Sequence, residues 1–69
     1  MNECSIEVNG VPLTFVGPIF VDAVVARSVS STRGIAVAVD RVVIPRSQWA
    51  ATQVFDGASV EIVTAAAGG

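Results

Sequence analysis

The stretch ECSIEVNGVPLTF, residues 3–15, decides the fold of this chain. Apolar and polar residues alternate on both sides of Asn9-Gly10, the dipeptide that a two-residue type I′ turn favours because both central positions need a positive φ. Such a turn sets the register of the two strands that it joins. It predicts three facing pairs on one apolar side of a hairpin: Val8 with Val11, Ile6 with Leu13, and Cys4 with Phe15. The opposite side carries Ser5, Glu7 and Thr14.

A connection over residues 16–19 leads from this hairpin into a segment with helical periodicity. Apolar residues recur there at spacings of three and four, which predicts an amphipathic helix over about residues 20–30. They are Val21, Val24, Val25 and Val29. Because β-branched residues have low helix propensity, this helix must be stabilised by packing on a sheet. Polar residues and Gly34 end it before residue 35.

Two further turns organise the second half of the chain. An apolar run at residues 35–39, Asp40-Arg41 and a second run at residues 42–44 predict a hairpin whose first strand lies inside the sheet. Pro45 ends this hairpin, and Ser47 is expected to cap a short helical turn over residues 48–51. Asp56-Gly57 then turns the chain into a last strand over residues 59–64.

Together these elements predict an α+β domain. A hairpin, a helix, a second hairpin and a last strand, in the order ββαββ(turn)β, fit a mixed sheet wrapped around one helix, the ubiquitin-like β-grasp fold. We expect the β-grasp domain to cover residues 1–64 and a flexible tail that ends in diglycine to cover residues 65–69. A chain of 69 residues holds one modest core, so a large catalytic cleft is not expected.

Charge and composition exclude several kinds of partner. The net charge is −2, there is no lysine, and the four arginines are scattered, so no basic stripe is available for nucleic acid. Apolar stretches are too short to span a membrane, and the N-terminal residues lack the basic and apolar regions of a secretory signal. A single cysteine cannot form an internal disulfide and suits a reducing compartment, so we expect a cytoplasmic protein.

The sequence offers no conventional catalytic equipment. It has no histidine and no tyrosine, and strand alternation turns its single cysteine, Cys4, toward the interior. A zinc site needs several Cys or His ligands at characteristic spacings, which this sequence lacks. We therefore expect no catalytic residue, no metal and no cofactor bound by this chain, and we do not expect an enzyme.

The terminal Gly68-Gly69 is the remaining candidate site. Two final glycines arise by chance about once in 200 chains, and without Cβ atoms they can pass through a narrow channel. The α-carboxyl group of Gly69 is ionised at neutral pH, so it is an oxygen nucleophile that can attack ATP held by a partner enzyme. A sulfur donor could then displace the nucleotide and leave a thiocarboxylate on Gly69, with Gly68 giving access.

The chain resembles the ThiS family of sulfur carriers over nearly its full length. The matching segments are Val8-Asn9-Gly10, AVAV at 36–39, VIPRSQW at 43–49, Asp56-Gly57, VEIVT at 60–64 and Gly68-Gly69. Pro-Arg-Ser-x-Trp at residues 45–49 is the most discriminating of them. The resemblance implies a β-grasp fold, adenylation of Gly69 by an E1-like enzyme that uses ATP, and conversion to a thiocarboxylate by a sulfur donor system. It also implies that thiazole synthase receives the sulfur for the thiazole of thiamine. Asp40-Arg41 departs from the family, whose members usually have a pair such as Asn-Gly there.

Two residues and two rival functions stay open at this stage. Trp49 is either a core anchor or a partner contact, and Arg46 is either a solvated side chain or a contact to an acidic partner. A carrier of the molybdopterin pathway shares the fold and the diglycine. A β-grasp module that binds proteins or RNA without covalent chemistry is the other rival. The run at residues 45–49 and the short length favour the thiazole pathway.

Overall fold

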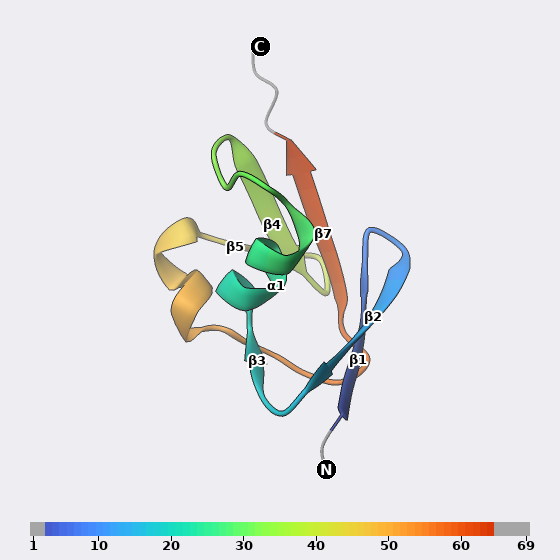
Figure 1. Cartoon of the computed structure of the whole chain (residues 1–69). Coiled ribbons are helices and arrows are strands. Elements are labelled where there is room, and N and C mark those ends of the chain that lie inside the picture. The colour runs from blue at the N-terminus through green and yellow to red at the C-terminus, as the bar shows by residue number, and fades with distance from the viewer. Residues whose placement is uncertain (1–2, 65–69) are drawn as a thin grey trace.

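A five-stranded sheet wraps around the α-helix in residues 3–64 of this protein, as Figure 1 shows for the computed structural model. The structure describes residues 3–64, and the predicted tail at residues 65–69 lies outside this range. The elements in chain order are β1 (Glu3–Val8), β2 (Val11–Val16), β3 (Ile19–Phe20), α1 (Val21–Ser28), β4 (Ile35–Val39), β5 (Val42–Ile44), the 3₁₀ helix η1 (Arg46–Ala51), β6 (Gln53–Val54) and β7 (Ser59–Thr64). The sheet order is β2-β1-β7-β4-β5, in which β1 and β7 are parallel and the other neighbours antiparallel. This arrangement is the predicted β-grasp.

The first hairpin has the predicted turn and register. Asn9 and Gly10 both have positive φ, 52° and 83°, and the facing pairs between β1 and β2 are those that the sequence predicts. The predicted apolar side is present, but it is not buried along its whole length, because Val11 is 58% exposed. The hairpin tip lies beyond the helix in Figure 1, so side chains near the turn have less of the core to pack against.

The helix is shorter than predicted. α1 begins at Val21 and ends at Ser28, because Phe20 and Val29 at its two ends have extended backbone. Its three buried valines, Val21, Val24 and Val25, have no exposed surface, so packing on the sheet stabilises this short helix, as β-branched residues require. Among residues 3–64, no helix is both long enough and apolar enough to cross a bilayer.

Two features next to the helix differ from the prediction. Ile19–Phe20 and Gln53–Val54 form a second, two-stranded sheet, β3 with β6. The first of these segments was predicted as connection and helix start, and no element was predicted for the second. The short helical turn is a 3₁₀ helix with Pro45 at its N-cap, and no side chain within residues 3–64 makes a hydrogen bond that caps its N-terminal end, so the predicted Ser47 cap is wrong. Strands of two residues show no periodicity, which is why the sequence does not predict them.

The second hairpin and the last strand are confirmed. β4 lies inside the sheet between β7 and β5, and β7 has the predicted bounds. The turn between β4 and β5 places Asp40 at φ 49° and Arg41 at φ 71°. Asp40 is anchored there, because its backbone N–H donates to the carbonyl oxygen of Ser59 (2.8 Å) and its Oδ1 accepts from the N–H of Ser59 (2.9 Å).

Replacing Arg41 by glycine is expected to stabilise the protein by about 0.5–1 kcal/mol, because a residue with a Cβ is strained in the left-handed region. Urea unfolding at 25 °C measures the difference. Arg33→Gly removes the same charge at an exposed site that lacks a positive φ, and there we expect a loss of up to about 1 kcal/mol. Equal effects of the two substitutions would contradict the assignment of strain to Arg41.

Candidate functional site

The candidate site lies where β7 ends, because the predicted reactive residues Gly68 and Gly69 follow this strand. Both glycines lie outside the described residues, and the described residues closest to them in sequence are those at the end of β7. β7 occupies the middle of the sheet between β1 and β4, and its side chains Val60 and Ile62 are buried. Its last residue, Thr64, pairs with Ile35 of β4. A central strand therefore leads directly to the tail.

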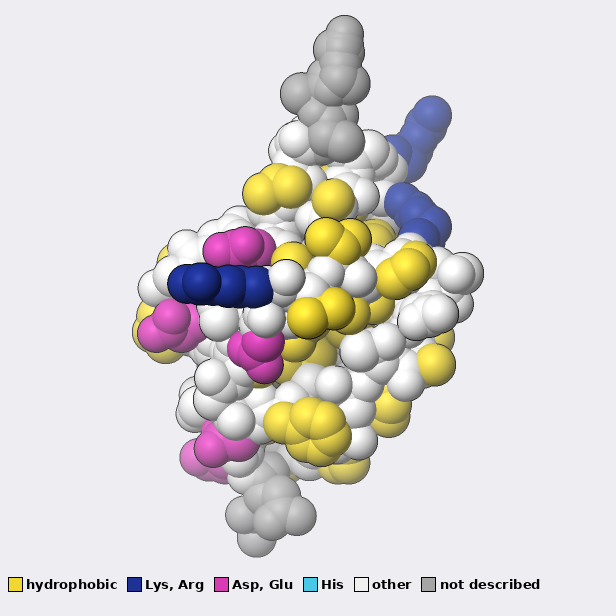
Figure 2. Space-filling view, turned by 180° about the vertical axis from the view of Figure 1, so that it is seen from behind, with side chains coloured by type: hydrophobic (Ala, Val, Ile, Leu, Met, Phe, Trp, Pro, Cys, Tyr) yellow, Lys and Arg dark blue, Asp and Glu magenta, His cyan; other side chains and the backbone are white. Residues whose placement is uncertain are grey.

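The outer face of the sheet carries an apolar surface next to this strand end. Residues of β4, β5 and β7 that point away from the helix line a shallow depression of about 210 Å³, which includes Ala36, Ala38, Val43, Glu61 and Val63. Val43 and Val63 are 69% and 57% exposed. Figure 2 views the molecule from behind, and hydrophobic side chains gather on the face that it shows, with acidic side chains to one side. We call five residues that line the depression, Ala36, Ala38, Val43, Glu61 and Val63, the outer patch.

The residues of the outer patch were not among the site residues predicted from the sequence. A strand with one face in water normally alternates apolar and polar residues. The runs IAVAV at residues 35–39 and VVI at residues 42–44 are apolar at every position. The first run predicts an interior strand, and β4 does lie inside the sheet. The lack of polar residues in both runs also indicates that both faces of these strands are apolar, and this signal could have identified the outer patch.

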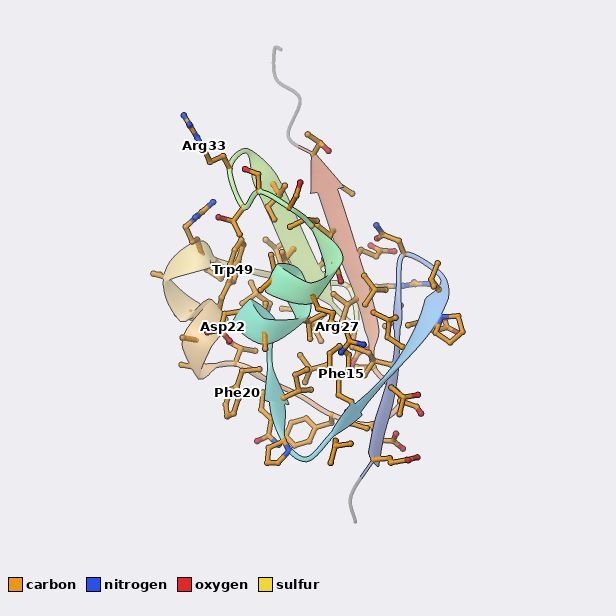
Figure 3. The ribbon with its side chains drawn as sticks, viewed as in Figure 1. Phe15, Phe20, Asp22, Arg27, Arg33 and Trp49 are labelled. Atoms are coloured by element: carbon orange, nitrogen blue, oxygen red, sulfur yellow. The ribbon has the colours of Figure 1, made fainter. Side chains whose placement is uncertain are left out.

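The inner side of the same region carries a groove with one cation. The groove has a volume of about 510 Å³ and lies between the tip of the first hairpin, the end of α1 and the end of β7, with Asn9, Leu13, Arg27, Ile35 and Thr64 among its lining residues. The Cζ atom of Arg27 lies 5.1 Å from the ring centroid of Phe15. Such a stack holds the guanidinium against an aromatic face. Figure 3 shows Arg27 and Phe15 on the same side of the helix.

Trp49 is a core residue, which confirms the first of its two readings. It is only 6% exposed, and its indole N–H donates to the carbonyl oxygen of Ile44 at 2.9 Å. It lies across the helix from Arg27 and Phe15 in Figure 3. A buried indole whose N–H is satisfied closes this side of a small core.

Arg46 is exposed and lies against Trp49. Its Cζ atom is 5.0 Å from the indole ring, and its guanidinium donates to the carbonyl oxygen and to Oγ1 of Thr32. Arg46 therefore covers the core anchor and ties the loop before β4 to η1. A contact between Arg46 and a partner stays a prediction.

Cys4 points inward, as predicted, and is buried. Its thiol donates weakly to the carbonyl oxygen of Val54, with Sγ 3.7 Å away. Burial raises the pKa of the Cys4 thiol, and the carboxylate of Asp56 adds to this increase. The group therefore stays a protonated thiol near neutral pH. Within residues 3–64, no three His, Cys, Asp or Glu side chains are grouped so that they could hold a metal ion.

Comparison with known proteins shows similarity along most of the chain. A sequence model of the ThiS family matches residues 5–69. A crystal structure of the thiamine biosynthesis protein ThiS from Geobacter metallireducens is similar, with a TM-score of 0.75 and 30% sequence identity. The alignment covers 87% of this chain and 91% of that one. A search of curated proteins finds no match.

Proposed function

This chain belongs to the ThiS family, whose members are sulfur carriers of thiamine biosynthesis that work with partner enzymes, and we propose that it carries sulfur as a thiocarboxylate on Gly69. One observation carries this proposal. The family match extends through residue 69, so it includes the Gly68-Gly69 pair that the chemistry needs.

The proposed reaction begins with the ionised carboxylate of Gly69. One of its oxygens attacks the α-phosphorus of ATP held by an E1-like partner, which forms an acyl-adenylate and releases pyrophosphate. A sulfur nucleophile from a donor system then attacks the carbonyl carbon. A C–S bond forms as the C–O bond to AMP breaks. Hydrosulfide as the nucleophile gives the thiocarboxylate directly, whereas a persulfide gives an acyl disulfide, whose S–S bond a thiol must then reduce to release the thiocarboxylate. The thiocarboxylate can pass its sulfur to thiazole synthase. This chain supplies the reacting terminus, while the catalytic groups belong to its partners.

The direct test follows sulfur onto the intact protein. The chain is incubated with ATP, a cognate adenylating enzyme and a sulfur donor, and its mass is then measured. Exchange of one oxygen for sulfur supports the proposal, and the mixture without ATP is the control. The activity of the adenylating enzyme is checked with a second carrier protein that it is known to modify. If that carrier is modified while the mass of this chain stays unchanged, the result favours the non-covalent binding module. The thiocarboxylate is then offered in turn to thiazole synthase and to the molybdopterin-forming enzyme. The enzyme that accepts its sulfur identifies which of the two carrier pathways the chain serves.

We further propose that the outer patch docks the adenylating partner. It adjoins the end of β7, so a partner that takes in the tail must lie close to this face. The patch combines the exposed side chains of Val43 and Val63 with the carboxylate of Glu61. An apolar surface with an acidic group fits a partner surface that is apolar at its centre and basic at its rim.

Val43→Asp is expected to weaken binding of the adenylating partner about tenfold or more, because it places a charge in the centre of the contact. The unfolding free energy should change by less than about 1 kcal/mol, since the side chain is exposed. Titration calorimetry and urea unfolding measure the two quantities. Val16→Asp is the matched control, because Val16 is 75% exposed on the edge strand β2 beside Glu3. A similar loss of binding in both variants would count against the outer patch.

A further inference from the structure

The side chain of Asn9 makes two hydrogen bonds to the last strand. Its Oδ1 accepts from the backbone N–H of Ile62 at 2.9 Å, and its Nδ2 donates to the carbonyl oxygen of Ile62 at 3.0 Å. Both bonds are partly buried and join residues 53 positions apart in the chain. The sequence predicts only a turn role for Asn9, which the positive φ of its backbone fulfils. The structure gives its side chain a second role.

This side chain continues the sheet beyond the point where β1 ends. Within residues 3–64, the parallel pairing of β1 with β7 covers only Glu7 with Ser59 and Val8 with Val60. The backbone N–H of Asn9 then donates to the carbonyl oxygen of Val60 at 2.9 Å, and the hairpin turns away. At Ile62, the next residue of β7 that faces β1, the amide group of Asn9 takes the place of a strand residue by offering one donor and one acceptor.

We propose that Asn9 is a positioning residue for the tail, which acts through Ile62. Ile62 lies two residues before Thr64, where β7 ends. β4 pairs with β7 up to Thr64 on one side, and Asn9 holds the other side as far as Ile62. The strand end is thus held from both sides, which sets the direction in which the tail leaves the sheet. This inference rests on the proposed function, because the direction of the tail matters only if the tail must enter a partner enzyme.

The expected consequence concerns recognition rather than chemistry. Without the two bonds to Asn9, the end of β7 is held by β4 alone and takes up a wider range of directions. Only part of that range suits the partner, and the apparent affinity falls in proportion to the competent fraction. Loss of the side chain should therefore raise KM for the carrier in the adenylation reaction by about threefold to tenfold, with kcat unchanged.

Asn9→Gly is the variant that isolates this role. Glycine accepts the positive φ of the turn, so the hairpin is kept while the two bonds to Ile62 are lost. Asp40→Gly is a matched control, because Asp40 occupies the first turn position of the other hairpin at φ 49° and its carboxylate accepts from Ser59 at the start of β7. It removes a comparable bond to the same strand, at the end distant from the tail.

Hydrogen exchange and kinetics give two independent readouts. In Asn9→Gly the amide of Ile62 should exchange on the order of tenfold faster, while the amide of Val37 in β4 keeps its rate after correction for global stability. KM should rise in Asn9→Gly and stay unchanged in Asp40→Gly. An unchanged exchange rate at Ile62, or an equal KM in both variants, overturns the proposal. If the wild-type protein is not adenylated at all, the proposed function is wrong. The exchange rate of the Ile62 amide then still shows whether the hydrogen bonds from Asn9 hold β7 in place.

Discussion

Removal of Gly69 is expected to lower thiocarboxylate formation by at least about a hundredfold, because the carboxylate then lies one residue, about 3.5 Å, short of the partner's ATP. The shortened chain still ends in a carboxylate, on Gly68, so the reacting group is displaced rather than abolished. The intact mass after incubation with ATP, adenylating enzyme and sulfur donor measures the product. Thermal unfolding should be unchanged, since the deletion leaves the sequence of residues 3–64, which form the sheets and the helix, intact.

The position of an added tag tests the same reaction without shortening the chain. A C-terminal affinity tag moves the reacting carboxylate off Gly69 and should abolish turnover. An N-terminal tag leaves Gly69 as the last residue and should preserve it. Equal activity of the two tagged proteins would refute Gly69 as the site of modification, whatever the family of the chain.

Trp49→Ala is expected to remove about 3–5 kcal/mol of unfolding free energy, as for other buried large-to-small substitutions. A protein of 69 residues typically has only about 3–10 kcal/mol in total, so much of this variant should be unfolded at 25 °C. The physical reason is the cavity left by a side chain that is only 6% exposed. Urea unfolding followed by circular dichroism measures the loss, because the variant has no tryptophan fluorescence.

Trp49→Phe is the matched control for this prediction. It keeps an aromatic ring in the core but loses the N–H that donates to the carbonyl oxygen of Ile44 in a partly buried hydrogen bond, which should cost about 0.5–1.5 kcal/mol, the net contribution of one such bond. The order of stability should be wild type, then phenylalanine, then alanine. A stable alanine variant that fails only in partner binding would show that Trp49 acts at the interface, against its role as a core anchor.

Local signals in the sequence were sufficient for most of the fold. Asn9-Gly10 determines the first hairpin, because a two-residue turn with two positive φ angles leaves one register for the flanking strands. Asp40-Arg41 and Asp56-Gly57 likewise mark the second hairpin and the start of β7. The motif at residues 45–49 and the final diglycine indicated the ThiS family, which the comparison with known proteins confirms.

The candidate site was predictable only in part. Gly68 and Gly69 are identified by chemistry and by family resemblance, and their assignment stays a prediction because they lie outside the described residues. The outer patch was not identified, because the apolar runs in residues 35–44 do not reveal which faces of the strands are covered. Trp49 had two readings until its burial was known.

The sequence by itself determined the elements whose evidence is local: turns with positive φ, the strands next to them, the helical spacing of valines and the chemistry of the terminus. Tertiary structure alone decided the pairing of β3 with β6, the exposure of Val11, the burial of Trp49 and the bonds from Asn9 to Ile62. The physical reason is that periodicity and turn preference arise between neighbours along the chain. Burial and cross-strand hydrogen bonds depend instead on residues that meet only after the chain has folded.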